Sequence, residues 1–166
     1  MNPSRSVLDD LLSEARLHAA RFGGPRPVAP AKHLAIVACM DSRIDVFGLF
    51  GLDTGDAHVI RNAGGLVTDD VLRSLVLSQR VLGTREIALV HHTDCGLQKI
   101  RDGEMEAQLE AEAGEPPPYR FGAFDDVEEA VRRALARVRE HAFLPYREGV
   151  RGFVYDVNTG VLREVR

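Results

Sequence analysis

Residues 34–43 read LAIVACMDSR, and residues 86–96 read EIALVHHTDCG. Each stretch opens with a short continuous apolar run, LAIVAC over 34–39 and EIALV over 86–90, which is typical of a strand covered on both faces. Each run then leads into polar residues that can bind a metal or titrate. In an open parallel sheet, ligand sites form at the carboxyl ends of the strands, beside the point where the strand order reverses. We therefore expect the two polar stretches to meet in one crevice, provided that their strands are neighbours.

The sequence around these two runs alternates between strand and helix patterns. AHVI at 57–60 predicts another strand, followed by a tight RNAGG turn at 61–65. Residues 44–52 predict a short helix or turn, and residues 69–82 have the apolar spacing of a longer helix, closed by Gly83. Alternating strands and helices predict an α/β fold, with a mostly parallel central sheet flanked by helices.

Three further segments complete the predicted body. Residues 103–124 are acidic at first and then rich in proline, so we expect a short helix followed by an irregular loop. Residues 125–141 form a strongly amphipathic pattern, with acids early and arginines late, as a helix dipole favours. The tail from residue 150 predicts two short strands around a turn at Asn158–Gly160.

Residues 1–30 predict an N-terminal helix and arm outside the body. Apolar positions over 6–21 have helical spacing, and Ser6 is the expected N-cap, with Asp9 three residues later. Glycine and proline then break regular structure over 22–30. A detached amphipathic helix needs an apolar surface against which to bury its face. We therefore expect this helix to wrap onto a neighbouring chain.

The composition limits the function classes. The chain has 166 residues, which fits a single domain, 1–166, with a real core. A net charge of -4 argues against nucleic acid as a partner, because phosphate binding needs a clustered basic face. No apolar run approaches the roughly 20 residues that cross a bilayer, and the N-terminus lacks an apolar signal core, so we expect a cytoplasmic protein without membrane contact. Two cysteines make no disulfide framework in a chain of this size.

The residues that carry chemistry gather after the two apolar runs: Cys39, Asp41 and Arg43 in the first polar stretch, and His92 and Cys95 in the second. Two thiolates with an imidazole select zinc ahead of magnesium or calcium. Three firm ligands with one exchangeable position make a catalytic zinc site, whereas four protein ligands make a closed structural one. Arg43 is spaced to hold the Asp41 carboxylate away from the metal in a bidentate pair. The residues alone predict a zinc site in an α/β domain and leave the role of Asp41 open.

Three motifs follow one another along the chain: CMDSR at 39–43, GDAHVIRNAGG at 55–65 and HHTDCG at 91–96. Together they resemble the C-x-D-x-R, G-D/E-x-x-x-x-R-N-A and H-x-x-C-G motifs of the β-class carbonic anhydrase family, in particular its short bacterial members. The resemblance runs from about Leu34 to Leu97. It implies the fold of that family over a single domain. It also implies the activity of a carbonate dehydratase, a zinc lyase with one zinc ion per chain that interconverts carbon dioxide and bicarbonate.

The resemblance implies a role for each matching residue. Cys39, His92 and Cys95 correspond to the zinc ligands of the family, and Asp41 and Arg43 to its catalytic dyad. The family also has a closed, inactive state in which the aspartate leaves the arginine and takes the fourth zinc position. Asp41 is therefore an expected metal ligand in that closed state only. The sequence does not decide which state dominates near neutral pH.

The resemblance further implies that the turn after the second strand lines the substrate pocket. That turn consists of Asn62, Ala63, Gly64 and Gly65. A glycine turn needed only for chain reversal explains the same residues, and Arg61 before them fits a buried ion-pair partner equally well. His91 is expected to point to the strand face opposite His92. His33 and His58 are candidate proton shuttles on general grounds alone.

The implied reaction is the attack of zinc-bound hydroxide on carbon dioxide. Zinc lowers the pKa of its bound water, and two thiolates should leave that water less acidic than on an all-histidine site, where its pKa is about 7. We therefore expect activity that rises towards alkaline pH. Carbon dioxide and bicarbonate are the expected small-molecule partners, and the family implies a homodimer or a multiple of dimers.

Two alternatives stay open. Related family members hydrolyse carbonyl sulfide or carbon disulfide with the same ligands, and the residues named above do not separate these substrates. A non-catalytic zinc-binding or anion-binding relative would also keep the ligands. Such a protein has no need of both Asp41 and Arg43, so the presence of the pair argues against it.

Overall fold

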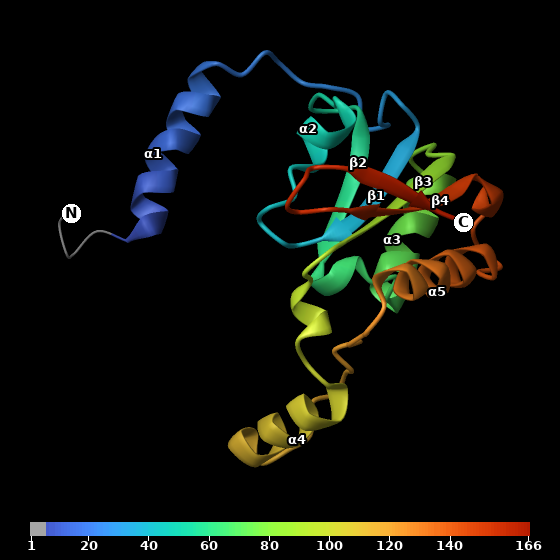
Figure 1. The fold of residues 1–166 in the computed structure, drawn as a ribbon. Helices are drawn as coiled ribbons and strands as arrows, with labels where there is room; N and C mark the ends of the chain where they lie inside the picture. Colours follow the sequence, from blue (N-terminus) through green and yellow to red (C-terminus); the bar gives the residue numbers. More distant parts are fainter. Residues whose placement is uncertain (1–5) are drawn as a thin grey trace.

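A five-stranded sheet forms the centre of the molecule. Its strands are β1 Leu34–Cys39, β2 Ala57–Asn62, β3 Glu86–His92, β4 Val150–Tyr155 and β5 Leu162–Val165. The computed structural model describes residues 6–166, which are drawn in colour in Figure 1. The strand order is β2-β1-β3-β4-β5, in which the first four strands are parallel and β5 runs antiparallel to β4. The predicted α/β fold with a mostly parallel sheet is therefore confirmed.

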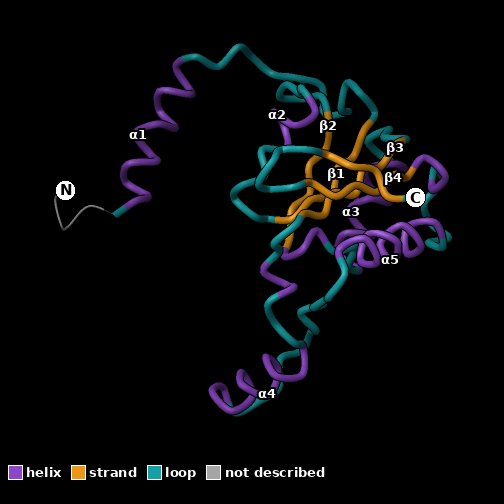
Figure 2. The backbone as a smooth tube through the Cα atoms, viewed as in Figure 1, coloured by secondary structure: helices purple, strands orange, loops and turns teal. Residues whose placement is uncertain are grey.

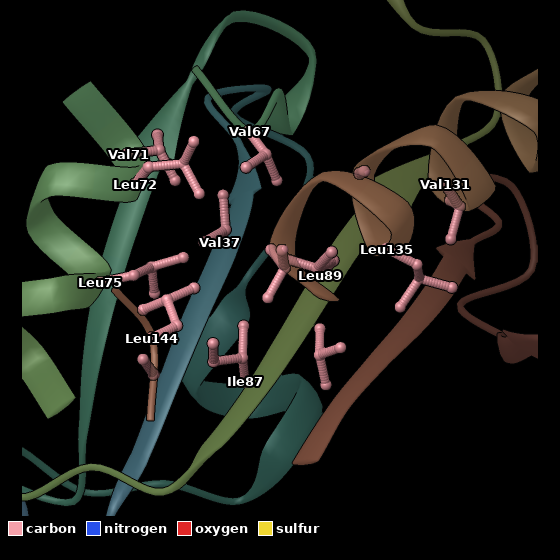
Figure 3. Close-up of a cluster of buried hydrophobic side chains, with 14 of the residues drawn as sticks. Val37, Val67, Val71, Leu72, Leu75, Ile87, Leu89, Val131, Leu135 and Leu144 are labelled. Carbon is pink, nitrogen blue, oxygen red and sulfur yellow. The ribbon is translucent and has the colours of Figure 1, made fainter. Parts of the chain in front are cut away.

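Helices cover both faces of this sheet. α3 Asp69–Arg80 and α5 Val127–Arg139 cover one face and α2 Val46–Phe50 the other. The remaining helices are α1 Val7–Ala20 and α4 Asp102–Ala113, and short 3-10 turns lie at Ala63–Gly65, Gly96–Gln98 and Arg147–Gly149. Strand side chains alternate between the two faces. Val37 and Leu89 point into an apolar layer with α3 and α5 (Figure 3). Ile36 and Val90 point into a second layer, which includes Val46 of α2.

Two strands are longer than the sequence predicts. The predicted turn at 61–65 is wrong at its first two positions, because Arg61 and Asn62 continue β2 in register with β1 as far as the pair Cys39–Asn62. β3 likewise extends through His92, because its last two residues pair with β4. Both extensions have the same cause: the neighbouring strand offers hydrogen-bond partners beyond the apolar run that reveals the strand. Cys39 and His92 are consequently the last residues of their strands.

Two helices extend away from the body, α1 at the N-terminus and α4 in the segment after β3 (Figure 1, Figure 2). The predicted cap of α1 is confirmed, since Ser6 and Asp9 form a reciprocal capping box. Neither helix buries a residue within the chain. The predicted extended arm after α1 and the irregular loop after α4 are both present. Across residues 6–166, no helix combines the length and the apolar character that crossing a membrane requires.

Candidate metal centre

The site lies at the carboxyl edge of β1 and β3. β1 pairs with β2 on one side and with β3 on the other, so the strand order reverses here and the condition that the two strands are neighbours is met. Cys39 ends β1, His92 ends β3, and Cys95 follows in the next turn. The ligand atoms of these three residues lie within 4.8 Å of one another, and all three side chains are buried. Sequence-distant residues thus converge into one cluster of two thiols and an imidazole.

The His92 ring presents a free nitrogen to this cluster. Its Nδ1 lies 2.9 Å from the carbonyl oxygen of Thr93. A carbonyl only accepts, so Nδ1 carries the ring proton and Nε2 keeps its lone pair. Within the described chain, Nε2 is buried and has no hydrogen-bond partner. An orphaned imidazole lone pair beside two thiols fits a zinc ion, and the fixed tautomer is the arrangement that metal-binding histidines use.

The two thiols are coupled by a hydrogen bond between them. The hydrogen bond from Cys95, helped by His92, lowers the pKa of Cys39 below its usual range. The same contact and burial raise the pKa of Cys95 well above its usual range. The hydrogen bond thus places a proton between the two sulfur atoms. A metal that binds here displaces that proton, because thiols bind metals as thiolates.

The turn that carries His92 and Cys95 is fastened to its surroundings. Thr93 accepts a hydrogen bond from the backbone N–H of Val157, 3.2 Å away, in the turn between β4 and β5. Gln98 accepts one from the N–H of Cys95 at 3.2 Å and donates one to the carbonyl of Asp125 at 3.1 Å. The segment that carries His92 and Cys95 is thus held by two other parts of the chain, at Asp125 and at Val157.

Asp41 and Arg43 form the bidentate pair that their spacing suggests. The Arg43 Nε and Nη2 atoms donate to the two carboxylate oxygens of Asp41 at 2.9 and 2.7 Å. These bonds hold the pKa of Asp41 well below its usual range, so the side chain is a carboxylate at neutral pH. Its Oδ2 lies 3.8 Å from the Nε2 of His92. In this structure Asp41 is therefore beside the ligand cluster and bound to Arg43.

Asp94 and Lys99 are site residues that the sequence reasoning missed. Arg43 donates from Nη1 to the Asp94 carboxylate at 2.9 Å and from Nη2 to the Asp94 carbonyl at 3.0 Å. Lys99 lies 2.7 Å from the other Asp94 oxygen. The contacts of Lys99, then Arg43, lower the pKa of Asp94 to about 2. Two signals were available: Asp94 lies between two candidate ligands, and Lys99 is one of two lysines in an arginine-rich chain.

Arg61 corrects an expectation. The sequence left it as a candidate for a buried ion pair, but its side chain is exposed and hydrogen-bonded to backbone. Its Nε donates to the carbonyl of Cys39 at 2.9 Å, and its Nη2 donates to the carbonyl of Asp41 at 2.6 Å. Arg61 thus fixes the path of the backbone between a candidate ligand and the carboxylate two residues later.

The turn after β2 packs directly on the site strands. Gly65 has φ +66°, and a Cβ atom there would lie 2.9 Å from the backbone nitrogen of Cys39 and 3.0 Å from the carbonyl oxygen of Val90. The glycine is therefore needed for close approach as well as for the turn itself. Asn62 donates to the carbonyl of Leu66 at 2.8 Å, while its own side-chain oxygen is buried without a partner in the described chain. That the turn lines a substrate pocket stays a prediction.

The remaining histidines lie outside the ligand cluster. His91 is fully buried, its ring packs on Phe124 with centroids 6.0 Å apart, and burial lowers its pKa to about 4. His58 pairs with Ala35 near the start of β1, and four strand residues separate that level from Cys39 by about 13 Å. Its ring bonds to Ser78, and the ring of His33 bonds to the carbonyl of Gly83. Neither shuttle candidate is near the metal-binding edge.

Comparisons with known proteins agree with this geometry. The family model described as carbonic anhydrase matches residues 34–113. Beta-carbonic anhydrase 1 of Mycobacterium tuberculosis is 49% identical over 160 residues, which cover 96% of this chain and 98% of that protein. A carbon disulfide hydrolase of Acidithiobacillus thiooxidans is 35% identical over 152 residues, 80% of this chain and 76% of the other. The crystal structure of carbonic anhydrase from Streptococcus mutans superposes with a TM-score of 0.90 at 41% identity, covering 98% of this chain and 99% of that one.

Proposed function

This chain belongs to the β-class carbonic anhydrase family, and we propose from that premise that it interconverts carbon dioxide and bicarbonate with one zinc ion per chain. One observation carries the proposal: a buried cluster of two thiols and an imidazole lies beside a carboxylate that an arginine holds. A purely structural zinc site needs four ligands and no such pair. The whole chain, 1–166, is taken as one catalytic domain.

The proposed zinc ligands are Cys39, His92 and Cys95, and Asp41 joins them only in a closed, inactive state. A zinc ion held by three ligands supplies a Lewis acid and lowers the pKa of a water molecule in its fourth position. The hydrogen bond from His92 Nδ1 to the carbonyl of Thr93 orients the ring so that Nε2 faces the other two ligands, as a ligand requires.

The proposed catalytic residues are Asp41 and Arg43. The carboxylate is ionised at neutral pH because Arg43 binds both of its oxygens. It can therefore only accept a hydrogen bond, and its role is to orient the attacking oxygen towards the carbon of carbon dioxide. Arg43 is the positioning partner, since its fork fixes both carboxylate oxygens at once.

The proposed substrate pocket is lined by Asn62, the last residue of β2, and by the turn of Ala63, Gly64 and Gly65 that follows it. Two positive φ angles, +73° at Gly64 and +66° at Gly65, fold its backbone onto the ends of β1 and β3. The free side-chain oxygen of Asn62 is buried beside this turn. A small apolar gas needs contact area and little else, so a tight turn of small residues suits it.

The decisive measurement combines zinc analysis with stopped-flow hydration of carbon dioxide on one sample, across mildly acidic to alkaline pH. The proposal expects about one zinc per chain, as a single three-ligand site requires, and hydration that rises with pH. Zinc without hydration would point to another substrate or to a binding role. Protein purified without chelator that contains no zinc would overturn the metal assignment.

Hydrolysis of carbon disulfide or carbonyl sulfide is the second candidate, favoured by the similarity to the carbon disulfide hydrolase of Acidithiobacillus thiooxidans. All of these substrates are linear, with an electrophilic central carbon, so the same ligands and pair serve each. The higher identity to a beta-carbonic anhydrase over nearly the whole chain makes hydration the first choice. Turnover of both substrates by the same sample separates the two.

The proposed assembly is a homodimer or a multiple of dimers in the cytoplasm. Apolar side chains of α1, among them Val7, Leu8, Leu11 and Leu12, are 56 to 74% exposed in the single chain. A second copy is the partner that would cover them, because a helix with an unpacked apolar face is marginal in water. Both cysteines are free thiols, which suits a reducing compartment.

A further inference from the structure

Arg43 divides its hydrogen bonds between two aspartates on different loops. Two of its N–H groups bind the carboxylate of Asp41, and two bonds reach Asp94, one to the carboxylate and one to the carbonyl. The planar guanidinium group thus donates hydrogen bonds from two of its edges, one to each aspartate. Its orientation is defined by Asp94 as fully as by Asp41.

Asp94 is itself held in an unusual backbone conformation. Its φ is +55°, in the left-handed region that non-glycine residues seldom adopt and that aspartate and asparagine tolerate best. This conformation turns the carbonyl and the carboxylate of Asp94 to the same guanidinium. Lys99 binds the remaining carboxylate oxygen at 2.7 Å. If only the backbone bend were required, glycine would serve, so the carboxylate indicates a further purpose.

The Arg43–Asp94 contact joins the two loops that carry the candidate zinc ligands. Arg43 follows Cys39 on the loop after β1, and Asp94 lies between His92 and Cys95 on the loop after β3. We propose that Asp94, anchored by Lys99, is a positioning residue that clips these loops together and fixes Arg43 for its bonds to Asp41. The catalytic part of this inference rests on the proposed function. The clip itself rests on the contacts alone.

The clip acts on geometry and contributes little to stability. The side chains of Arg43, Asp94 and Lys99 are 43, 47 and 64% exposed, and exposed ion pairs add little to the free energy of unfolding. Groups that orient metal ligands and catalytic side chains nevertheless affect metal retention and turnover strongly. A substitution at Asp94 should therefore change site properties while the melting temperature hardly moves.

The test compares Asp94→Asn and Asp94→Gly with the wild-type holoenzyme. Both replacements accept a left-handed φ, so the backbone bend survives while the charge or the whole side chain is lost. We expect zinc loss to a chromophoric chelator to be about tenfold faster and kcat about tenfold lower, with little change in KM. Asp70→Asn is the control, because it removes another exposed aspartate–arginine pair, Asp70–Arg73, at the start of α3 and outside both ligand loops, and it should leave all three quantities unchanged.

A double variant tests the role of Lys99. Lys99→Met keeps the length of the side chain and removes its charge, so it should reproduce part of the Asp94→Asn effect. Since Lys99 acts through Asp94, Asp94→Asn with Lys99→Met should be no worse than Asp94→Asn alone. Additive effects of the two substitutions on zinc loss would overturn the proposed anchoring.

Amide hydrogen exchange makes the clip testable even if the protein hydrates no carbon dioxide. Loss of the clip should speed exchange over residues 40–45, on the loop opposite the substitution, in zinc-loaded and zinc-free protein alike. Faster exchange confined to residues 93–99, with unchanged zinc loss, would overturn the clip. Normal hydration by wild type together with unchanged kcat in both Asp94 variants would overturn its catalytic part alone.

Discussion

The metal-binding edge and the N-terminal helix both have clear local sequence signals, yet only the edge is buried within the chain. At the edge, Cys39, His92 and Cys95 are 4, 0 and 1% exposed, and their loops are fastened by hydrogen bonds from several elements. α1 has a full capping box but buries no residue. Favourable local sequence, such as a capping box, is therefore enough to define a helix. The surface against which its apolar side chains are buried determines what stabilises it. The ligand cluster is buried within one chain, whereas the apolar face of α1 is exposed there, as the proposed dimer would require.

The largest expected effect is at the edge. His92→Ala removes the imidazole from the cluster, so zinc should be lost and kcat/KM for hydration should fall by at least about a thousandfold, because metal chemistry provides most of the acceleration. Zinc analysis and stopped-flow hydration measure both quantities. His33→Asn is the control, since His33 is exposed near the start of β1 and asparagine tolerates its positive φ of 51°. Full zinc retention by His92→Ala would show that the ligand set is wrong.

Gly65→Ala tests how tightly the edge is packed. The new Cβ atom would lie closer to backbone atoms of Cys39 and Val90 than van der Waals contact allows, and the φ of this residue is positive. We therefore expect a loss of about 3 kcal/mol in the free energy of unfolding. Urea unfolding of the holoenzyme measures it. Gly51→Ala is matched in φ, at +60°, but has open space around its Cβ. It should therefore lose only about 1 kcal/mol. Equal losses in both variants would mean that Gly65 provides a turn and nothing more.

Asp41→Asn separates metal binding from catalysis at the same edge. The amide keeps the size of the side chain but loses the charge that Arg43 binds, so we expect retained zinc and kcat/KM lower by about a hundredfold. A pKa held below the usual range means that Asp41 loses its charge only in strong acid. The alkaline rise in kcat/KM therefore belongs to another group and should survive in the variant. A rise that disappears with Asp41 would assign the titration to this carboxylate.

Leu12→Gln tests whether α1 packs against a second copy of the chain. Leu12 is 58% exposed in the single chain, so its replacement should not change the stability of the rest of the chain. A dimer that buries Leu12 should lose about 2 kcal/mol of association free energy per chain. Sedimentation at several concentrations measures the dissociation constant, with Glu14→Gln on the same helix as control. The weakened protein should still hold its zinc, because all three candidate ligands come from one chain. A dimer of unchanged affinity would mean that another surface joins the copies.

The contrast also explains how far the sequence predicts the molecule. The apolar runs correctly predict the positions of β1 and β3, and the motifs predict the residues that converge at the ends of these strands. Both predictions succeed because the signals are short contiguous patterns in the sequence. The same reasoning stopped β2 at Ile60, since a neighbouring strand and not local sequence extends it to Asn62. It likewise missed Asp94 and Lys99, whose importance follows from contacts with a residue 51 positions away from Asp94. The sequence patterns mark these residues as unusual, but they do not identify Arg43 as the partner of Asp94.

The smallest effect compares two helix caps. Ser6 caps α1 through a hydrogen bond from the N–H of Asp9, and Thr68 caps α3 through one from the N–H of Val71. Replacing either by alanine should cost its helix about 1 kcal/mol. Because α3 packs on the core, Thr68→Ala should lower the free energy of global unfolding by that amount. Because α1 is separate from the body, Ser6→Ala should instead weaken dimerisation and speed amide exchange in α1 alone. A fall in global stability of the monomer in Ser6→Ala would show that α1 packs on its own chain, and the contrast between the two regions would then be lost.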